Sequence, residues 1–276
     1  MTDQNVYQPG DTKILPLVDR VVEALILPGS GISGMEHIRD LYGKAVSGKS
    51  CLLLLEHYSN LDLPILSYLL RQAPDPGKKI ADSLISIAGM KLNEASPTVA
   101  AFTGAYTRLV IYPSRSLSGL DPEKDRAEKL RSISINRAAM KTLTEVKTQG
   151  KIILVFPSGT RYRPWDPDTK KGVREIDSYI KSFDYLCPVA LNGEVLHVRQ
   201  GDMMDDYVSR DLIRVTAGPV RSCREFRDAA RSKTEALGPA DKKQATVDAV
   251  MELLEEMHSA AEPERKKLLE LKNPDT

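Results

Sequence analysis

Residues 51–66, CLLLLEHYSNLDLPIL, contain a run of apolar residues, a short polar turn and the start of a helix. The leucine-rich run at 51–56 is typical of a strand that is buried on both faces. Asp62 suits the beginning of a helix, and Pro64 suits its first turn, where the missing N–H costs no hydrogen bond. The stretch therefore predicts a buried strand, a loop and a helix in direct succession.

The same alternation of strands and helices is expected along most of the chain. Apolar runs predict strands at 84–88, 109–112, 152–156, 186–191 and 212–216, and helical patterns cover 12–27, 35–46, 96–102, 121–148, 224–232, 240–260 and 264–271. This order predicts an α/β fold with a central mixed, mostly parallel sheet flanked by helices. We expect a single domain over residues 1–276, with an N-terminal helical segment at 1–47, a sheet core that carries the site at 48–220 and C-terminal helices at 221–276.

Composition is that of an ordinary globular protein, with 41% hydrophobic and 28% charged residues. The formal net charge of +1 disfavours a nucleic-acid partner, because such binders concentrate an excess of Lys and Arg. The three cysteines, Cys51, Cys187 and Cys223, have no C-x-x-C spacing. They predict neither a disulfide framework nor a zinc site, and they favour a reducing compartment.

The sequence predicts neither a secretory signal nor a membrane-spanning segment. The N-terminus lacks the basic start and apolar stretch of a secretory signal, and every apolar run is far shorter than the roughly 20 residues that span a bilayer. We expect a cytoplasmic protein, with peripheral contact at the inner membrane face left open. The amphipathic segment 12–27 is interpreted as a helix that packs on the core, and a membrane-facing role is the alternative.

The first chemical motif joins His57, at the end of the buried strand, to Asp62, at the start of the following helix. Transfer of a group to an alcohol needs a base, and imidazole titrates in the useful range. A neighbouring carboxylate orients the ring and stabilises the imidazolium that forms. The alternative interpretation is a loop histidine at a helix start with no chemical role.

The second motif, Phe156-Pro-Ser-Gly-Thr-Arg161-Tyr-Arg163-Pro, follows the strand at 152–156. Glycine permits close approach of a backbone, and two arginines in an irregular loop can converge on an anion such as phosphate. Arg115 follows another strand and could complete a phosphate site. The alternative is a surface loop with solvated arginines. Since loops at the carboxyl ends of parallel strands share one edge of the sheet, we expect these motifs to face one cleft.

Taken together, the motifs resemble the glycerolipid acyltransferase family. The four motif blocks of that family are matched in order by His57-x4-Asp62, by residues 112–116, by Phe156-Pro-Ser-Gly-Thr-Arg161 and by the strand that contains Cys187-Pro-Val. The resemblance spans about residues 52–191.

The arginine loop is more similar to one branch of this family than to another. Pro157-Ser-Gly-Thr-Arg-Tyr-Arg-Pro164 resembles the Pro-Ser-Gly-Gly-Arg-Asp-Arg-Pro of soluble, plastid-type glycerol-3-phosphate acyltransferases. Membrane-bound lysophosphatidate enzymes have Phe-Pro-Glu-Gly-Thr-Arg instead. Two positions depart from the soluble branch: Thr160 replaces its second glycine, and Ser116 replaces a basic residue. The motifs therefore specify the reaction type more closely than the acceptor.

The resemblance implies roles for the residues that match. His57 is the general base, Asp62 is its partner, and Arg115, Arg161 and Arg163 hold the phosphate of the acceptor. We expect the backbone amides of Ser158, Gly159 and Thr160 to stabilise the oxyanion.

The implied reaction moves a fatty acyl group from acyl carrier protein or coenzyme A to the 1-hydroxyl of glycerol 3-phosphate. Neither a metal nor an organic cofactor is expected, because the thioester supplies the driving force. Two alternatives stay open. One is acylation of lysophosphatidate at its 2-position, and the other is a noncatalytic phospholipid-binding protein on the same fold.

Overall fold

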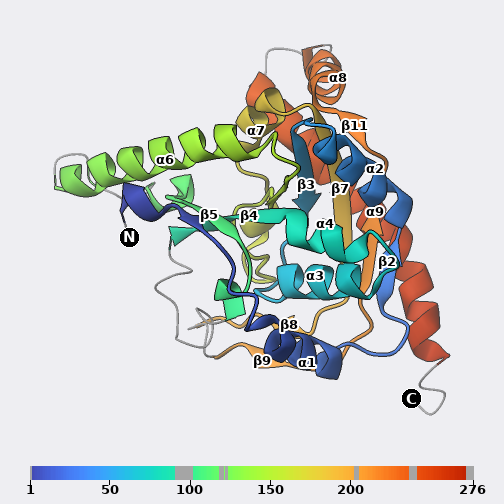
Figure 1. Cartoon of the computed structure of the whole chain (residues 1–276). Helices are drawn as coiled ribbons and strands as arrows, with labels where there is room; N and C mark the ends of the chain where they lie inside the picture. Colours follow the sequence, from blue (N-terminus) through green and yellow to red (C-terminus); the bar gives the residue numbers. More distant parts are fainter. Residues whose placement is uncertain are drawn as a thin grey trace.

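A central sheet organises the computed structural model, which describes residues 2–90, 102–117, 121, 124–201, 205–235 and 241–271 (Figure 1). In these residues the strand order is β1 (Tyr7–Gln8), β5 (Arg108–Ile111), β4 (Leu84–Gly89), β6 (Ile152–Val155), β3 (Cys51–Leu55), β7 (Tyr185–Asn192), β10 (Arg214–Ala217) and β2 (Gly31–Ser33), and β11 (Arg221–Ser222) also pairs with β7. A separate pair is formed by β8 (Leu196–His197) and β9 (Tyr207–Val208).

The middle of the sheet is parallel, and its margins are mixed. Strands β5, β4, β6, β3 and β7 all run in the same direction, so their carboxyl ends share one edge. Strands β1 and β10 are antiparallel to their neighbours β5 and β7, and β2 is parallel to β10. The prediction of a mixed, mostly parallel sheet in an α/β domain is confirmed.

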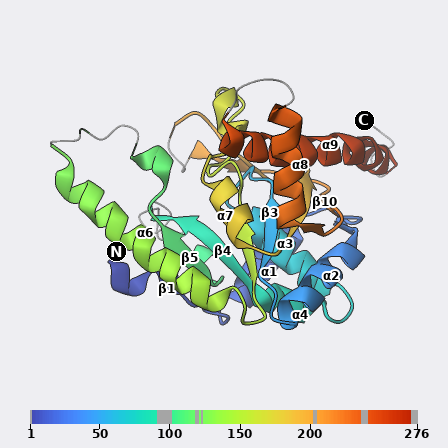
Figure 2. The same ribbon diagram turned by 90° about the horizontal axis from the view of Figure 1, so that it is seen from above.

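Helices cover both faces of the sheet (Figure 2). One hydrophobic cluster contains α1 (Leu15–Leu25), α2 (Met35–Val46), α3 (Asp62–Gln72) and α4 (Gly77–Ser83). The other contains α6 (Arg126–Val146), α7 (Ile176–Ser182), α8 (Cys223–Glu235) and α9 (Lys242–Glu270). Short 3-10 helices lie at η1 (Asp3–Asn5), η3 (Ser114–Ser116) and η4 (Pro167–Lys170).

Strand β3 contributes to both clusters because its side chains alternate between the two faces. Leu53 and Leu55 belong to the cluster with α1 to α4, whereas Leu52 and Leu54 belong to the cluster with α6 to α9. All four leucines are fully buried. The apolar run that predicted a doubly buried strand therefore forms the centre of the core.

Most predicted elements are present, with differences at their ends. The predicted helix at 96–102 lies almost entirely outside the described residues. Two short strands of the N-terminal segment, β1 and β2, join the sheet although only helix was expected there. Helices α4 and α7 were also not predicted, since each spans only seven residues.

The prediction of separate helices at 240–260 and 264–271 was wrong, because α9 continues through Pro263. Beyond this proline, Arg265 donates from Nε to the carbonyl of Leu212 at 2.7 Å and from Nη1 to Glu262 at 2.8 Å. These contacts hold the last turns of α9 against the sheet, and they compensate for the hydrogen bond that proline cannot make.

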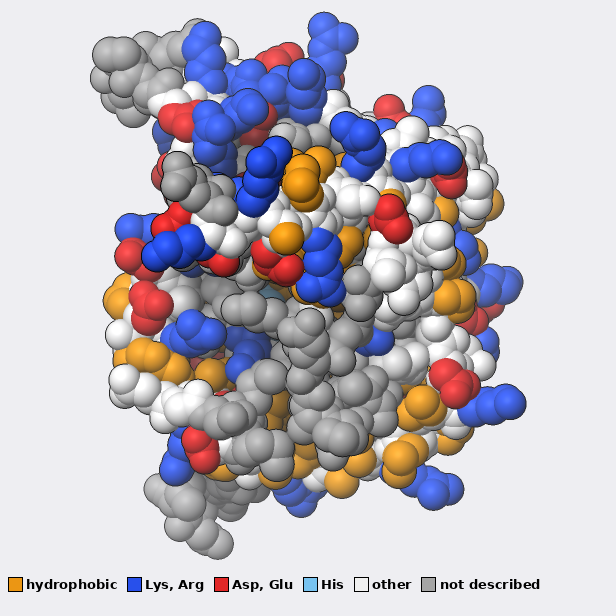
Figure 3. All heavy atoms as spheres, turned by 90° about the vertical axis from the view of Figure 1, so that its left-hand side faces the viewer, with side chains coloured by type: hydrophobic (Ala, Val, Ile, Leu, Met, Phe, Trp, Pro, Cys, Tyr) orange, Lys and Arg blue, Asp and Glu red, His pale blue; other side chains and the backbone are white. Residues whose placement is uncertain are grey.

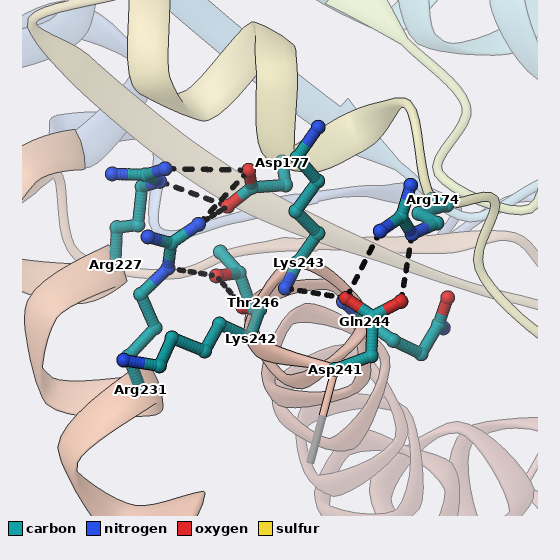
Figure 4. A network of polar contacts seen from close by, with 9 residues as sticks. All are labelled: Arg174, Asp177, Arg227, Arg231, Asp241, Lys242, Lys243, Gln244 and Thr246. Carbon is teal, nitrogen blue, oxygen red and sulfur yellow. Dashed lines mark hydrogen bonds and ion pairs between the residues drawn. The ribbon is translucent and has the colours of Figure 1, made fainter. Parts of the chain in front are cut away.

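A polar network joins α7, α8 and the start of α9 (Figure 4). Asp177 of α7 is 1% exposed and accepts hydrogen bonds from Arg227 at 2.8 Å and Arg231 at 2.9 Å. Asp241 caps α9 by accepting from the N–H of Lys243, and it pairs with Arg174 at 2.7 Å. These contacts tie the C-terminal helices to the remainder of the domain.

Among the described helices, none is both long and apolar enough to pass through a bilayer.

The Asp177 network predicts a pH-dependent contribution to stability. Burial disfavours the charged carboxyl, but hydrogen bonds from Arg227 and Thr246 and the charges of Arg227 and Arg231 outweigh it, so the pKa of Asp177 is lowered. We expect Asp177→Asn to lower the free energy of unfolding by roughly 2–4 kcal/mol near neutral pH. Because the folded-state pKa is below that of the unfolded chain, this difference should decline as the pH falls below about 4.

Urea unfolding between about pH 3 and pH 7 measures this dependence. Asp228→Asn is the matched control, because Asp228 is largely exposed and lies 3.9 Å from Arg224. A difference between wild type and Asp177→Asn that persists unchanged at the lowest pH would contradict the assignment.

Candidate active site

His57 and Asp62 form a hydrogen-bonded pair between the end of β3 and the start of α3. The Nδ1 atom of His57 is 2.9 Å from Oδ2 of Asp62. The side chain of Asp62 is 2% exposed and that of His57 is 16% exposed. A carboxylate at Nδ1 favours the tautomer with its proton on that nitrogen, which leaves the lone pair of Nε2 available as a base.

Three further donors converge on the carboxylate of Asp62. The N–H of Tyr58 lies at 2.6 Å, and the N–H and the hydroxyl of Ser59 each lie at 2.9 Å. Every partner donates, so the two oxygens act only as acceptors, and the N-terminus of α3 favours negative charge at this position. The turn after β3 is therefore folded around Asp62, which in turn holds the ring of His57.

The arginine loop after β6 meets the histidine loop directly. The ring of Phe156 stacks on the ring of His57, with centroids 3.9 Å apart and planes inclined by 21°. The N–H of Tyr162 donates to the carbonyl of His57 at 2.8 Å. Two motifs separated by about a hundred residues are thus joined through both a ring contact and a backbone hydrogen bond.

His57 lines a pocket of about 360 Å³ between this loop and α9. Ser158, Tyr162, Lys170 and Met251 are among the residues that surround it. The Nε2 atom of His57 has no hydrogen-bond partner among the described residues. A hydroxyl group in this pocket could therefore hydrogen bond to Nε2 without displacing a protein contact.

The two arginines of the loop, Arg161 and Arg163, line a second, smaller pocket of about 260 Å³. Its lining consists of Arg161, Arg163, Trp165, Val198, Arg199, Gly201 and Asp206. Arg161 donates to Asp206 at 2.6 Å, and their side chains are 12% and 5% exposed. Among the described residues, the guanidinium of Arg163 has no hydrogen-bond or ion-pair partner. Three arginines and one carboxylate leave this pocket positively charged, as an anion site requires.

Arg199 of this pocket was not found by sequence reasoning. It follows β8, and its guanidinium lies 4.5 Å from the ring centroid of Tyr207 on β9. In the sequence, Arg199 is only an arginine seven residues beyond the end of β7. Such a position is too common in proteins to indicate a site. Only the fold brings Arg199 beside Arg161 and Arg163.

Arg115 lies apart from the other two predicted arginines. It follows β5, which is two strand spacings, or about 10 Å, from β6. Its Nη2 donates to the carbonyls of Asp168 at 3.3 Å and Lys171 at 3.2 Å. Arg115 is not among the described residues that line either pocket. The structure thus places it at the far end of the arginine loop rather than beside Arg161 and Arg163.

In the turn at Ser158, Gly159 and Thr160, one backbone amide makes a hydrogen bond and the other two have no acceptor among the described residues. The N–H of Gly159 donates to the carbonyl of Phe156 at 2.9 Å, so it is occupied. Among the described residues, the amides of Ser158 and Thr160 have no acceptor. The hydroxyl of Ser158 donates to the carbonyl of Thr160 at 2.6 Å and shapes the turn. Gly159 has φ of +65°, and a β-carbon there would lie 3.0 Å from Val173.

A second imidazole–carboxylate pair lies beside His57, although His258 showed no partner pattern in the sequence. Nδ1 of His258, on α9, is 3.0 Å from Glu56, and the hydroxyl of Tyr58 is 3.1 Å from both side chains. Glu56 also accepts from the N–H of Leu191 at 2.8 Å. The residues that flank His57 in sequence, Glu56 and Tyr58, thereby anchor α9 over the pocket.

The three cysteines are all buried and free. Burial raises the pKa of Cys51 to about 12 and that of Cys187 to about 12, so these thiols are poor nucleophiles at neutral pH. Within the described part of the chain, no three His, Cys, Asp or Glu side chains come together in a metal-binding arrangement.

The Glu56–His258 pair predicts a contribution to stability that is lost at high pH. The hydrogen bond to Glu56 raises the pKa of His258, although burial opposes the shift. Stabilisation is therefore complete below the unfolded-state pKa of about 6.5 and is lost as the pH rises through the higher folded-state pKa. We expect the unfolding free energies of wild type and His258→Gln to differ most near pH 6 and to converge at higher pH.

Urea unfolding at a series of pH values tests this expectation. His37→Gln is the control, because His37 lies on α2 with its side chain 33% exposed. A difference that widens with rising pH would contradict the assignment.

Comparison with known proteins identifies the family. No curated protein matches the chain. The family model described as Acyltransferase matches residues 31–230, well over half of the chain, from β2 into α8. The matched segment contains His57, Asp62 and the arginine loop. The chain therefore belongs to the acyltransferase family, whose members transfer acyl groups in lipid metabolism.

Proposed function

We propose that the protein transfers a fatty acyl group from an acyl thioester to the 1-hydroxyl of glycerol 3-phosphate and so forms lysophosphatidate. The donor is acyl carrier protein or coenzyme A carrying the acyl chain. The observation that carries the proposal is the His57–Asp62 pair, in which a buried carboxylate is hydrogen-bonded to Nδ1 at 2.9 Å and His57 lines a pocket beside the arginine loop.

In the proposed mechanism His57 acts on the acceptor hydroxyl. Nε2 takes the hydroxyl proton as the oxygen attacks the thioester carbonyl carbon, and Asp62 stabilises the imidazolium. When the tetrahedral intermediate collapses, the carbon–sulfur bond breaks and the imidazolium returns the proton to the departing thiolate. The activated oxygen belongs to the substrate, so no covalent acyl-enzyme forms.

The oxyanion of that intermediate needs hydrogen-bond donors in fixed positions. The amides of Ser158 and Thr160 are the candidates in the turn, because the amide of Gly159 already donates to Phe156. Ser158 is buried and lines the His57 pocket. Of the three backbone amides that the sequence analysis expected to stabilise the oxyanion, two therefore remain as candidates.

The acceptor phosphate is proposed to bind between Arg163 and Arg199. Arg163 has no side-chain partner among the described residues, and Arg199 is exposed at the same pocket. Arg161 is paired with Asp206, which balances its charge, so its proposed role is to shape the pocket. Arg115 supports the arginine loop through its two backbone contacts.

Product analysis tests both the identity of the acceptor and the role of His57 as the general base. Purified protein is incubated with a labelled acyl thioester and with either glycerol 3-phosphate or lysophosphatidate. We expect lysophosphatidate as the product from glycerol 3-phosphate. We also expect His57→Gln to lower turnover by roughly 10²–10⁴-fold, the usual contribution of a general base, while glycerol 3-phosphate binding is retained.

His37→Gln serves as the matched control and should keep wild-type turnover. Acylation of lysophosphatidate without acylation of glycerol 3-phosphate would favour the 2-position reaction. Near-normal turnover by His57→Gln would remove His57 from the mechanism, and phospholipid binding without turnover by wild type would favour the noncatalytic alternative.

The phosphate assignment predicts a binding defect in Arg163→Ala. Loss of one charge-assisted hydrogen bond should raise the KM for glycerol 3-phosphate by roughly 10- to 100-fold and leave kcat nearly unchanged, since the phosphate is bound alike in ground and transition states. Arg224→Ala is the control, because the Arg224 side chain on α8 is 91% exposed. An unchanged acceptor KM in Arg163→Ala would exclude the residue from the site.

A further inference from the structure

The long helix α6 has one face in the core and an opposite face open to solvent. Ile135, Ala139 and Leu143 are buried in the cluster with α7 and α9. Asn136 accepts from the N–H of Tyr112 at 2.8 Å and donates to its carbonyl at 3.0 Å. The side-chain amide of Asn136 is thus hydrogen-bonded to the end of β5. These bonds and the buried side chains determine which face of α6 points toward the core.

The opposite side, here called the outer face of α6, carries large apolar side chains. Its members are Arg126, Leu130, Ile133, Arg137, Met140 and Lys141, all of them exposed. Leu130 is 60% exposed, Ile133 is 56% exposed and Met140 is 41% exposed. The apolar members recur over ten residues, a length of about 15 Å along the helix. A helix that faces only water normally has polar residues on this side.

Cations surround these apolar side chains. Helix α6 carries five Lys or Arg residues and two Glu residues, whereas the formal net charge of the whole chain is +1. One of the two, Glu128, pairs with Arg131 at 3.3 Å. Figure 3 shows the side of the molecule toward which α6 projects in Figure 1, and in its upper part Lys and Arg side chains gather with several Asp and Glu and with exposed hydrophobic side chains.

Figures 1 and 2 both show the N-terminal part of α6 reaching beyond the body of the domain. A projecting helix can approach a broad, flat surface without interference from neighbouring elements.

We infer that the outer face of α6 docks the protein on an anionic lipid membrane. Apolar side chains at this spacing can enter the boundary between headgroups and acyl chains, while Arg and Lys remain among the lipid phosphates. The outer face is the convex surface of a single helix and carries cations among its apolar residues. These properties suit a flat anionic lipid surface better than a protein partner that needs a complementary groove. This inference goes beyond the proposed function and does not depend on which acceptor is used.

Vesicle flotation with the full chain tests the inference. The probes are phosphatidylcholine vesicles and vesicles that mix phosphatidylcholine with phosphatidylglycerol. We expect wild type to bind the anionic vesicles, and Leu130→Ser combined with Ile133→Ser to weaken binding by roughly tenfold or more through loss of apolar burial. Arg137→Gln should weaken it roughly fivefold, and added salt should weaken binding by wild type.

Two matched controls separate this face from other exposed residues. Leu17→Ser removes a leucine that is 58% exposed on α1, and Arg224→Gln removes a charge on α8. Both should bind vesicles as wild type does. Circular dichroism and turnover with a short-chain acyl-coenzyme A should be unchanged in the α6 variants, so that failure of docking is distinguished from failure of the proposed reaction.

The inference would be overturned if the α6 variants bound anionic vesicles like wild type, or if Leu17→Ser lost as much binding as they did. A raised KM for acyl carrier protein thioesters, with vesicle binding intact, would instead assign the face to an acidic protein partner.

Discussion

Strands β3 and β6 pair in parallel from Cys51↔Ile152 to Leu54↔Val155, and this register brings the residues after both strands to the same edge of the sheet. Phe156 therefore emerges beside the end of β3, where it stacks on His57. The hydrogen bond from Tyr162 to the carbonyl of His57 extends the same alignment into the loops. A slip of one residue would turn the leucines of β3 to the wrong faces, so burial of the core and assembly of the site depend on one register.

Buried carboxylates hold the candidate functional groups in position. Asp62 orients His57, Asp206 holds Arg161, and Glu56 holds His258. Each carboxylate side chain is at most 6% exposed. Because a paired side chain has already lost its conformational freedom, less entropy is lost when substrate binds.

Helix α9 completes the wall of the His57 pocket, although it lies outside the segment that the family model matches. Met251, Leu254 and Glu255 of this helix line the pocket, and His258 ties it to Glu56 beneath. The cap at Asp241 and the contacts of Arg265 hold its two ends. The proposed catalytic pair, His57 and Asp62, thus lies in the segment that the family model matches, whereas one wall of the pocket belongs to the C-terminal helix.

The sequence alone determined the α/β alternation, the doubly buried strand β3 and the proximity of His57 to Asp62, because apolar periodicity and a five-residue separation are local properties. It could not reveal that Arg199 joins Arg163 while Arg115 lies apart, since strand order decides which loops meet. Nor could it reveal the pairing of Glu56 with His258, which are separated by 202 residues. The continuation of α9 through Pro263 likewise came from tertiary contacts of Arg265, which outweigh the local preference of proline to end a helix.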